Sequence, residues 1–139
     1  MDWKTCVNGG NSVKITPDRK RAAFLIKQAE KTLRALRKIS MDENNASVFF
    51  PNYYDAFLEL MHAIMYARGY RVNNHYCLGY YLRDAIKDGE SYRIFDRARS
   101  IRNSLIYYGE TFDKPVIDEV IAKIISSFVI NIYCPFDCF

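Results

Sequence analysis

The part of the 139-residue sequence that is richest in functional groups covers residues 97–109 and reads RARSIRNSLIYYG. At the 100° per residue of an α-helix, three polar side chains of this region and Asp96 just before it fall within about 80° of one another, and Arg102 borders them on the apolar side. A guanidinium at such a border is partly desolvated and needs an acceptor, either a carboxylate inside the fold or a phosphate outside it. The segment therefore predicts an anion-binding helix face. Its four polar members are Asp96, Arg99, Asn103 and Tyr107.

A second group of cations lies between residues 14 and 38, where nine basic residues accompany two acidic ones in a chain whose formal net charge is only +4. Helical spacing places five of these cations within about 60° of one another. Such a line attracts phosphate groups through Coulomb attraction and counterion release, although long cationic side chains also cover solvated helix faces without a partner. We take Lys27, Lys31 and Arg34 as candidate phosphate contacts. The five cations are Lys20, Lys27, Lys31, Arg34 and Lys38.

The segment 51–69 is apolar around about 220° of its predicted helical circumference, which indicates a central helix packed on two sides. Its narrow polar strip either faces water or lines a cleft. Asp55, Glu59 and His62 from this strip are candidate supporting residues of a site. The chain has two histidines, His62 and His75, and a lone histidine is more commonly a packed or exposed side chain than a general base. The strip consists of Asp55, Glu59, His62 and Tyr66.

Common catalytic signatures are missing from the sequence: there is no Gly-rich phosphate loop, no G-x-S-x-G elbow and no H-E-x-x-H zinc helix. The four cysteines are Cys6, Cys77, Cys134 and Cys138. Cys134 and Cys138 have no second Cys or His pair nearby that could complete a tetrahedral zinc shell, so we expect no metal site and no cofactor. A reducing compartment would keep all four residues as thiols, and paired disulfides are the less favoured alternative.

The apolar residues recur with a period near 3.6 and no segment shows sustained strand alternation, so the sequence predicts an all-α fold. We expect an antiparallel up-and-down bundle of four to five helices, formed by a single domain over residues 1–139. Irregular tails are expected at 1–15 and 134–139. Capping residues, prolines and glycines mark the helix ends. The first expected helix begins near residues 16–18. The other expected helices cover residues 51–69, 75–87, 91–107 and 115–133.

The last apolar segment, residues 116–133, contains Asp118, Glu119 and Lys123, and charges near the middle of a membrane-spanning helix cost several kcal/mol each. We therefore expect no membrane helix. The first residues, MDWKTCVNGG, lack the cationic start and apolar run of a signal peptide. The expected location is the cytoplasm.

Three segments together resemble the HEPN superfamily, the small helical domains of prokaryotic toxin–antitoxin and defence systems. The segments PNYYDAFL at 51–58 and HAIMYARGY at 62–70 look like the tyrosine-rich second helix of that family and its Gly turn. The segment IRNSLIYYG at 101–109 looks like the signature helix, in which an Arg, often followed by Asn, precedes a His by four to six residues. The resemblance covers nearly the whole chain and implies the HEPN helical bundle.

The resemblance also implies catalytic residues. In active HEPN proteins the signature Arg and His of two subunits meet at a dimer interface and cleave RNA without metal. Arg102 matches that Arg and Asn103 the polar residue after it, whereas Tyr107 stands where the His is expected. A phenol, with an unperturbed pKa of about 10, is a poor base at neutral pH. The resemblance therefore favours an RNA- or nucleotide-binding subunit with a degenerate motif, with weak cleavage or none near pH 7.

Partners are implied in the same way. A homodimer is expected, and many HEPN proteins are encoded beside a minimal nucleotidyltransferase that neutralises them, in some cases by modifying a signature tyrosine. Tyr107 and Tyr108 are candidates by position, although Tyr108 is expected to pack on the apolar side of its helix.

Two alternatives stay open. One is an active metal-independent ribonuclease toxin, in which Arg99 and Arg102 hold a phosphate and Tyr107 or His62 transfers a proton. The other is an all-α adaptor whose line of cations binds an acidic protein. The adaptor hypothesis would gain support if Arg102 formed an ion pair with a buried carboxylate of the same monomer.

Overall fold

The computed structural model describes residues 1–133. The long helices agree with the helical pattern of the sequence. One small two-stranded sheet is also present, which the pattern does not predict. A π-helical segment, η1, directly follows helix α4. The elements are α1 (Trp3–Asn8), β1 (Ser12–Lys14), α2 (Arg19–Arg37), α3 (Ala46–Arg68), β2 (Tyr70–Val72), α4 (His75–Tyr80), η1 (Tyr81–Ile86), α5 (Gly89–Tyr107) and α6 (Lys114–Tyr133).

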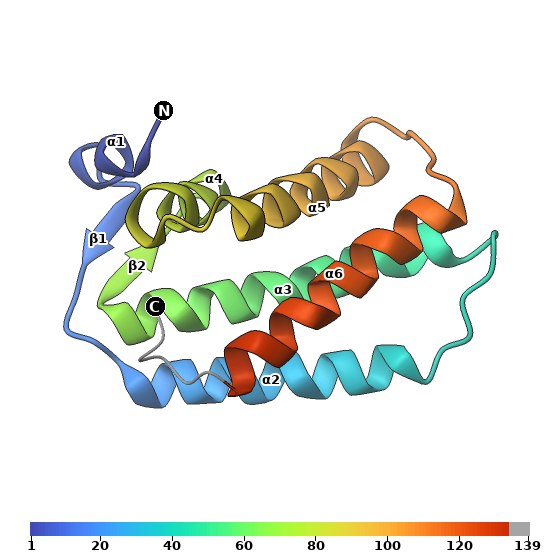
Figure 1. Cartoon of the computed structure of the whole chain (residues 1–139), viewed down its shortest axis with the longest axis horizontal. Coiled ribbons are helices and arrows are strands. Elements are labelled where there is room, and N and C mark those ends of the chain that lie inside the picture. Colours follow the sequence, from blue (N-terminus) through green and yellow to red (C-terminus); the bar gives the residue numbers. More distant parts are fainter. Residues whose placement is uncertain (134–139) are drawn as a thin grey trace.

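Successive long helices run in opposite directions, with α3 between α2 and α5, while α6 crosses in front of α3 and runs in the same general direction as α3 (Figure 1). The chain is therefore mostly helical, and the all-α prediction is confirmed at this level. The central position predicted for the segment 51–69 is also confirmed, because α3 packs against α2, α5 and α6. Its buried aromatic rings, Tyr54 and Phe57, meet Phe95 of α5 at centroid distances of 6.2 and 5.9 Å.

Local signals explain where the long helices begin and end. Asp18 caps α2 by accepting a hydrogen bond from the Arg21 N–H at 3.0 Å, and Asp88 caps α5 in the same way. Gly69 ends α3 in the left-handed conformation, with φ of 86°. A Cβ at Gly69 would also lie 2.9 Å from the carbonyl oxygen of Ile15, so both its backbone conformation and its packing require glycine.

Helix α3 begins earlier than predicted, at Ala46 instead of near Pro51. Pro51 lacks an N–H and so forgoes one backbone hydrogen bond inside the helix. The additional turn nevertheless buries Ala46 and Phe50, which are 2% and 0% exposed, in the core. The burial of these two side chains outweighs the missing hydrogen bond.

The segment 1–15 is not an irregular tail, which corrects the prediction. It contains α1 and the short strand β1, which pairs antiparallel with β2 in the register Val13 opposite Arg71. Trp3 anchors the segment by packing its ring edge-on against Tyr70 and Tyr81, at 5.1 and 4.9 Å between centroids. Three-residue strands are too short to show an alternating pattern, so tertiary contacts define them. The predicted tail at 134–139 lies outside the described residues.

Cys6 and Cys77 form a disulfide that joins α1 to α4 across 71 residues of sequence. The prediction of free thiols is therefore wrong for this pair. Both residues are fully buried, and their Cα atoms are 6.0 Å apart, as usual for a disulfide. Cysteine spacing alone does not determine which residues pair, because the pairing depends on how the helices fold together. Cys134 and Cys138 lie outside the described residues.

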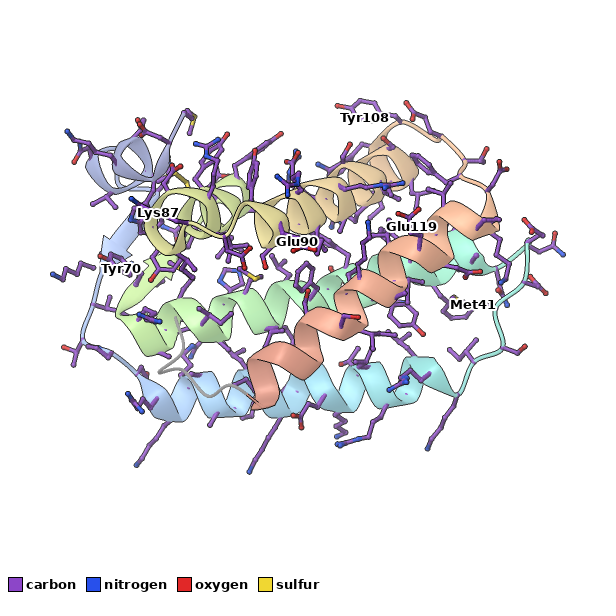
Figure 2. All side chains as sticks on the ribbon, in the orientation of Figure 1. Met41, Tyr70, Lys87, Glu90, Tyr108 and Glu119 are labelled. Carbon is purple, nitrogen blue, oxygen red and sulfur yellow. A yellow bond between two sulfur atoms is a disulfide. The ribbon has the colours of Figure 1, made fainter. Side chains whose placement is uncertain are left out.

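The end of α5 differs from its predicted packing. Phe95, Ala98 and Ile101 are buried as predicted for the apolar side of this helix. Tyr108, however, is 74% exposed and points away from the helices in Figure 2, so the prediction that it packs on that side is wrong. Ile106 and Tyr107, in the last turn of α5, are also exposed, at 46% and 66%.

None of the helices in residues 1–133 combines the length and the apolar character needed to span a membrane.

Candidate phosphate-binding site

The guanidinium of Arg102 is the centre of the candidate site. The side chain is half-buried on α5, and its Nε is enclosed without a hydrogen-bond partner. Its Nη1 donates two long hydrogen bonds, of 3.3 Å each, to Asn103 Oδ1 and Tyr107 Oη. No carboxylate among the described residues forms an ion pair with Arg102. The guanidinium therefore retains donors for an acceptor from outside the chain.

Arg99 lies one turn earlier on α5 and adds a second cation. Its Nη2 pairs with Asp96 Oδ1 at 2.8 Å, and its guanidinium lies over the ring of Tyr76, 4.1 Å from the centroid. Tyr76 belongs to α4 and is 47% exposed. The pair with Asp96 neutralises part of the Arg99 charge, and the aromatic ring holds the guanidinium in place. Arg99 is thus positioned beside the more open Arg102.

Tyr54 and His75 lie on the buried side of the site. Tyr54 of α3 is fully buried, and its hydroxyl lies 3.4 Å from Nδ1 of His75, the first residue of α4. The Arg102 guanidinium lies 5.7 Å from the centroid of the Tyr54 ring and 5.6 Å from that of Tyr107. Arg102 therefore connects a buried phenol and its histidine partner with an exposed phenol.

The electrostatic effects agree with this grouping. Burial raises the pKa of Tyr54 to about 12, against the opposing charges of Arg102 and Arg99. Burial and the nearby positive charge of Arg102 lower the pKa of His75 below its ordinary value. His75 is therefore a neutral imidazole at pH 7, and Tyr54 keeps its proton.

Two residues of the polar strip of α3 line a groove, and one of them, Asp55, is also exposed to solvent. Asp55 and Glu59 border a groove of about 530 Å³ between α2 and α3, together with Lys31. Partial burial raises the pKa of both carboxyl groups, and Arg102 and His75 oppose this effect at Asp55. Asp55 thus borders the groove and also lies close enough to Arg102 for their charges to interact.

His62, the third supporting candidate, lies on the same side of α3. Its ring centroid is 6.4 Å from that of His75. Burial, His75 and Arg21 lower the pKa of His62, in that order of effect. The two histidines of the chain therefore lie side by side, although 13 residues separate them in the sequence.

The structure brings only some of the predicted site residues together. Those on α5, namely Asp96, Arg99, Arg102, Asn103 and Tyr107, form one cluster through the contacts above. Lys27, Lys31 and Arg34 are exposed on α2, and α3 lies between α2 and α5 (Figure 1). Nitrogen-tipped side chains project from α2 away from the other helices in Figure 2. The cations of α2 and α5 therefore form two separate surfaces.

Sequence reasoning did not place Tyr54, His75 and Tyr76 in the site. Each belongs to α3 or α4, and only the packing of α4 against α3 and α5 brings them to Arg99 and Arg102. Gly79 permits this packing, since a Cβ there would lie 3.2 Å from Phe95 Cδ1. A useful signal in the sequence was the Asn74 cap before His75, which fixes the start of α4 and thus the position of the imidazole.

Comparison of the chain with protein-family models, curated proteins and solved structures finds no match. Among the residues that the structure describes, no group of three or more His, Cys, Asp or Glu side chains could hold a metal ion. The chemistry of the site therefore has to be judged from its own groups. Two guanidinium groups, exposed aromatic rings and a neutral imidazole are suited to a phosphodiester and its bases.

Proposed function

We propose that this protein is an RNA- or nucleotide-binding subunit of the HEPN type, with Arg99 and Arg102 as its phosphate site. The observation that carries the proposal is the state of Arg102, whose guanidinium is partly buried yet forms no ion pair with a carboxylate in the described residues. Such a group gains most from an external anion with several oxygen acceptors. A phosphate of RNA or of a nucleotide has this chemistry.

The aromatic rings around the two arginines favour a nucleic acid over inorganic phosphate. Tyr76, whose ring lies under Arg99, is 47% exposed, and Tyr107, whose ring lies beside Arg102, is 66% exposed. Exposed aromatic rings next to a phosphate site provide stacking surfaces for unpaired bases, worth about 1–3 kcal/mol per base. Single-stranded RNA is therefore the preferred ligand class of the proposal.

The partners proposed are a second copy of this chain and a minimal nucleotidyltransferase, in a toxin–antitoxin or defence system. Their support is the resemblance of residues 101–109 to the HEPN signature, together with the exposed last turn of α5. Ile106, Tyr107 and Tyr108 form an apolar surface there that a partner could cover. The second candidate function is an active metal-independent ribonuclease, which the histidine beside Arg102 favours.

The adaptor hypothesis loses support because Arg102 is not sealed by a carboxylate within residues 1–133. Its remaining support is the exposed line of cations on α2, which would attract an acidic protein as well as RNA.

We expect Arg102→Ala to weaken the binding of a single-stranded oligoribonucleotide by about tenfold or more, because a charge-assisted hydrogen bond contributes about 1.5–3 kcal/mol. Lys31→Ala is the matched control. Lys31 is exposed and contributes mainly screened attraction, so its loss is expected to change the affinity by about threefold or less. Fluorescence anisotropy titrations at one fixed salt concentration measure both. Equal losses for the two variants would show that the phosphate site is not at Arg102.

A further inference from the structure

We propose that the groove between α2 and α3 binds a small aliphatic α-amino acid in its zwitterionic form, with Asp55 and Glu59 holding the ammonium group and Lys31 the carboxylate. The proposal goes beyond the proposed function, because its ligand contains no phosphate and its principal contacts lie on α2 and α3. It gives a role to charged residues that the phosphate site on α5 does not use.

The groove has the size of a small-molecule site. Helices α2 and α3 run side by side in opposite directions, and the groove lies between them (Figure 1). Its volume of about 530 Å³ is within the range of about 300–1,000 Å³ that is usual for such sites. Polar and apolar side chains both line it, as they do in pockets that orient a ligand through a few polar contacts.

The charged side chains that line the groove are unpaired. Asp55 and Glu59 lie one turn apart on α3, and Lys31 lines the groove from α2. Within residues 1–133, neither carboxylate forms an ion pair with Lys31 or with any other cation. The two walls therefore present opposite charges to a common space without contacting each other. A ligand that carries both charges would pair with both walls.

Glu59 gives the strongest indication that a cationic group belongs in the groove. Its Oε2 is enclosed and has no hydrogen-bond partner among the described residues. Burial raises the pKa of the Glu59 carboxyl, and the charge of Asp55 adds to this effect. An enclosed acceptor without a donor is unfavourable, and so is an uncompensated charge. A positively charged ligand group with N–H donors would relieve both.

Asp55 and Glu59 are spaced so that they can share one ammonium group. Residues four apart on an α-helix lie on the same face, about 6 Å apart along the axis, and an ammonium group has three N–H donors. No group of three or more metal-binding side chains is present in the described part of the chain, so the pair is better matched to an ammonium than to a metal ion. Arg102 and His75 offset part of the Asp55 charge, which leaves Glu59 as the principal contact.

The antiparallel course of the two helices gives the groove a polar end and an apolar end. Gln28 and Lys31 of α2 lie towards the Glu59 end, because rising residue numbers on α2 run beside falling numbers on α3 (Figure 1). Leu36 and Ile39 lie towards the opposite end, where Leu36 is buried and Ile39 half-buried. An aliphatic side chain of the ligand would pack there, while its charged head lies between Lys31 and Glu59.

The charge of Lys31 favours a zwitterion over a simple amine. Lys31 would repel a ligand that carries only an ammonium group, whereas it attracts an α-carboxylate. A ligand that carries only a carboxylate would in turn be repelled by Asp55 and Glu59. An aliphatic α-amino acid satisfies both walls and the apolar end of the groove.

The experiment titrates the full ¹⁵N-labelled chain with L-leucine and follows the backbone amide signals. Saturable shifts are expected at Lys31, Thr32 and Glu59, which line the groove. L-leucine amide lacks the carboxylate and is expected to bind at least about threefold more weakly, since an exposed ion pair with Lys31 is lost. The acid 4-methylpentanoate lacks the ammonium group and is expected to bind at least about tenfold more weakly, since the charged hydrogen bonds to Glu59 are lost.

Glu59→Gln keeps the shape of the side chain and removes its charge, and it is expected to weaken L-leucine binding by about tenfold or more. Glu30→Gln is the matched control, because Glu30 lies on α2 outside the groove, and its binding is expected to stay within about twofold of wild type. Thermal unfolding checks that both variants are folded.

Lys31→Met tests the carboxylate contact. Without the ammonium group of Lys31, L-leucine and L-leucine amide are expected to bind with nearly equal affinity, because the group that distinguishes them is gone. Lys27→Met is the control, since Lys27 is exposed on α2 and does not line the groove, and it is expected to keep the wild-type preference.

Three results would overturn the proposed site: no saturable shift at the groove, equal affinity of wild type and Glu59→Gln for L-leucine, or binding of 4-methylpentanoate as tight as that of L-leucine. A preference for L-leucine over its amide that persists in Lys31→Met would overturn the assignment of Lys31. The RNA titration of Arg102→Ala tests the proposed function separately, so failure of either account is recognised on its own.

Discussion

Replacement of Phe95 by alanine is expected to lower the free energy of unfolding by about 3–5 kcal/mol. Phe95 is 1% exposed and lies where three helices meet. Its ring packs against Tyr54 and Phe57 of α3, and Gly79 of α4 lies close enough that a Cβ there would approach the ring to 3.2 Å. Truncation leaves a cavity that these neighbours cannot fill without moving.

Urea denaturation followed by circular dichroism measures this effect, with Phe24→Ala as the control. Phe24 is 59% exposed on α2, so its truncation is expected to change the free energy of unfolding by no more than about 0.5 kcal/mol. Because Phe95 supports Tyr54, the variant is also expected to bind RNA more weakly. Similar stabilities of the two variants would mean that α3, α4 and α5 do not pack around Phe95.

The second large effect concerns the Cys6–Cys77 disulfide. Removing it with the double variant Cys6→Ala and Cys77→Ala is expected to cost about 4 kcal/mol, because the bond closes a long loop in the unfolded chain. The loss is expected to affect α4 in particular, because this helix is tied to α1 by the bond and carries His75 and Tyr76.

Chemical denaturation of wild type with and without a reductant gives an independent measurement. The reductant is expected to lower the denaturation midpoint of wild type and to leave that of the double variant unchanged. A midpoint of wild type that does not respond to reduction would show that the two cysteines do not form a disulfide in solution.

The helices could be predicted where a local signal sets their ends. The Asp18 cap and the left-handed Gly69 act within one turn of their own helices, so the sequence contains all the information needed. The start of α3 could not be predicted in this way, because Pro51 is a local signal for a helix start that the burial of Phe50 overrides.

Elements held by distant contacts were not predictable. Strand β1 exists because it pairs with β2, and α1 is held by the disulfide and by the packing of Trp3. These contacts join residues at opposite ends of a long stretch of sequence. No periodicity over a few residues reveals them.

The residues of the candidate site also differ in whether local sequence patterns could predict them. Arg99, Arg102, Asn103 and Tyr107 lie on one helix, where a period of 3.6 residues is sufficient to place them together. The contributions of Tyr54 and His75 depend on how α3 and α4 pack against α5. Charge counting along the sequence identified Lys27 and Arg34 as a second group of candidate phosphate contacts, but it does not show that α3 separates α2 from α5 (Figure 1).

The central claim, that a phosphate binds at Arg102, is tested most directly by the side-chain Nε–H resonance of this residue in ¹⁵N-labelled protein. The signal is assigned by its disappearance in Arg102→Lys. Titration with a single-stranded oligoribonucleotide is expected to shift the Arg102 signal in a saturable manner, because the enclosed Nε lacks a partner in the free protein. The Arg34 signal, from the exposed face of α2, is expected to shift little. An unchanged Arg102 signal, together with a saturable shift at Arg34, would contradict the assignment and place RNA binding on α2.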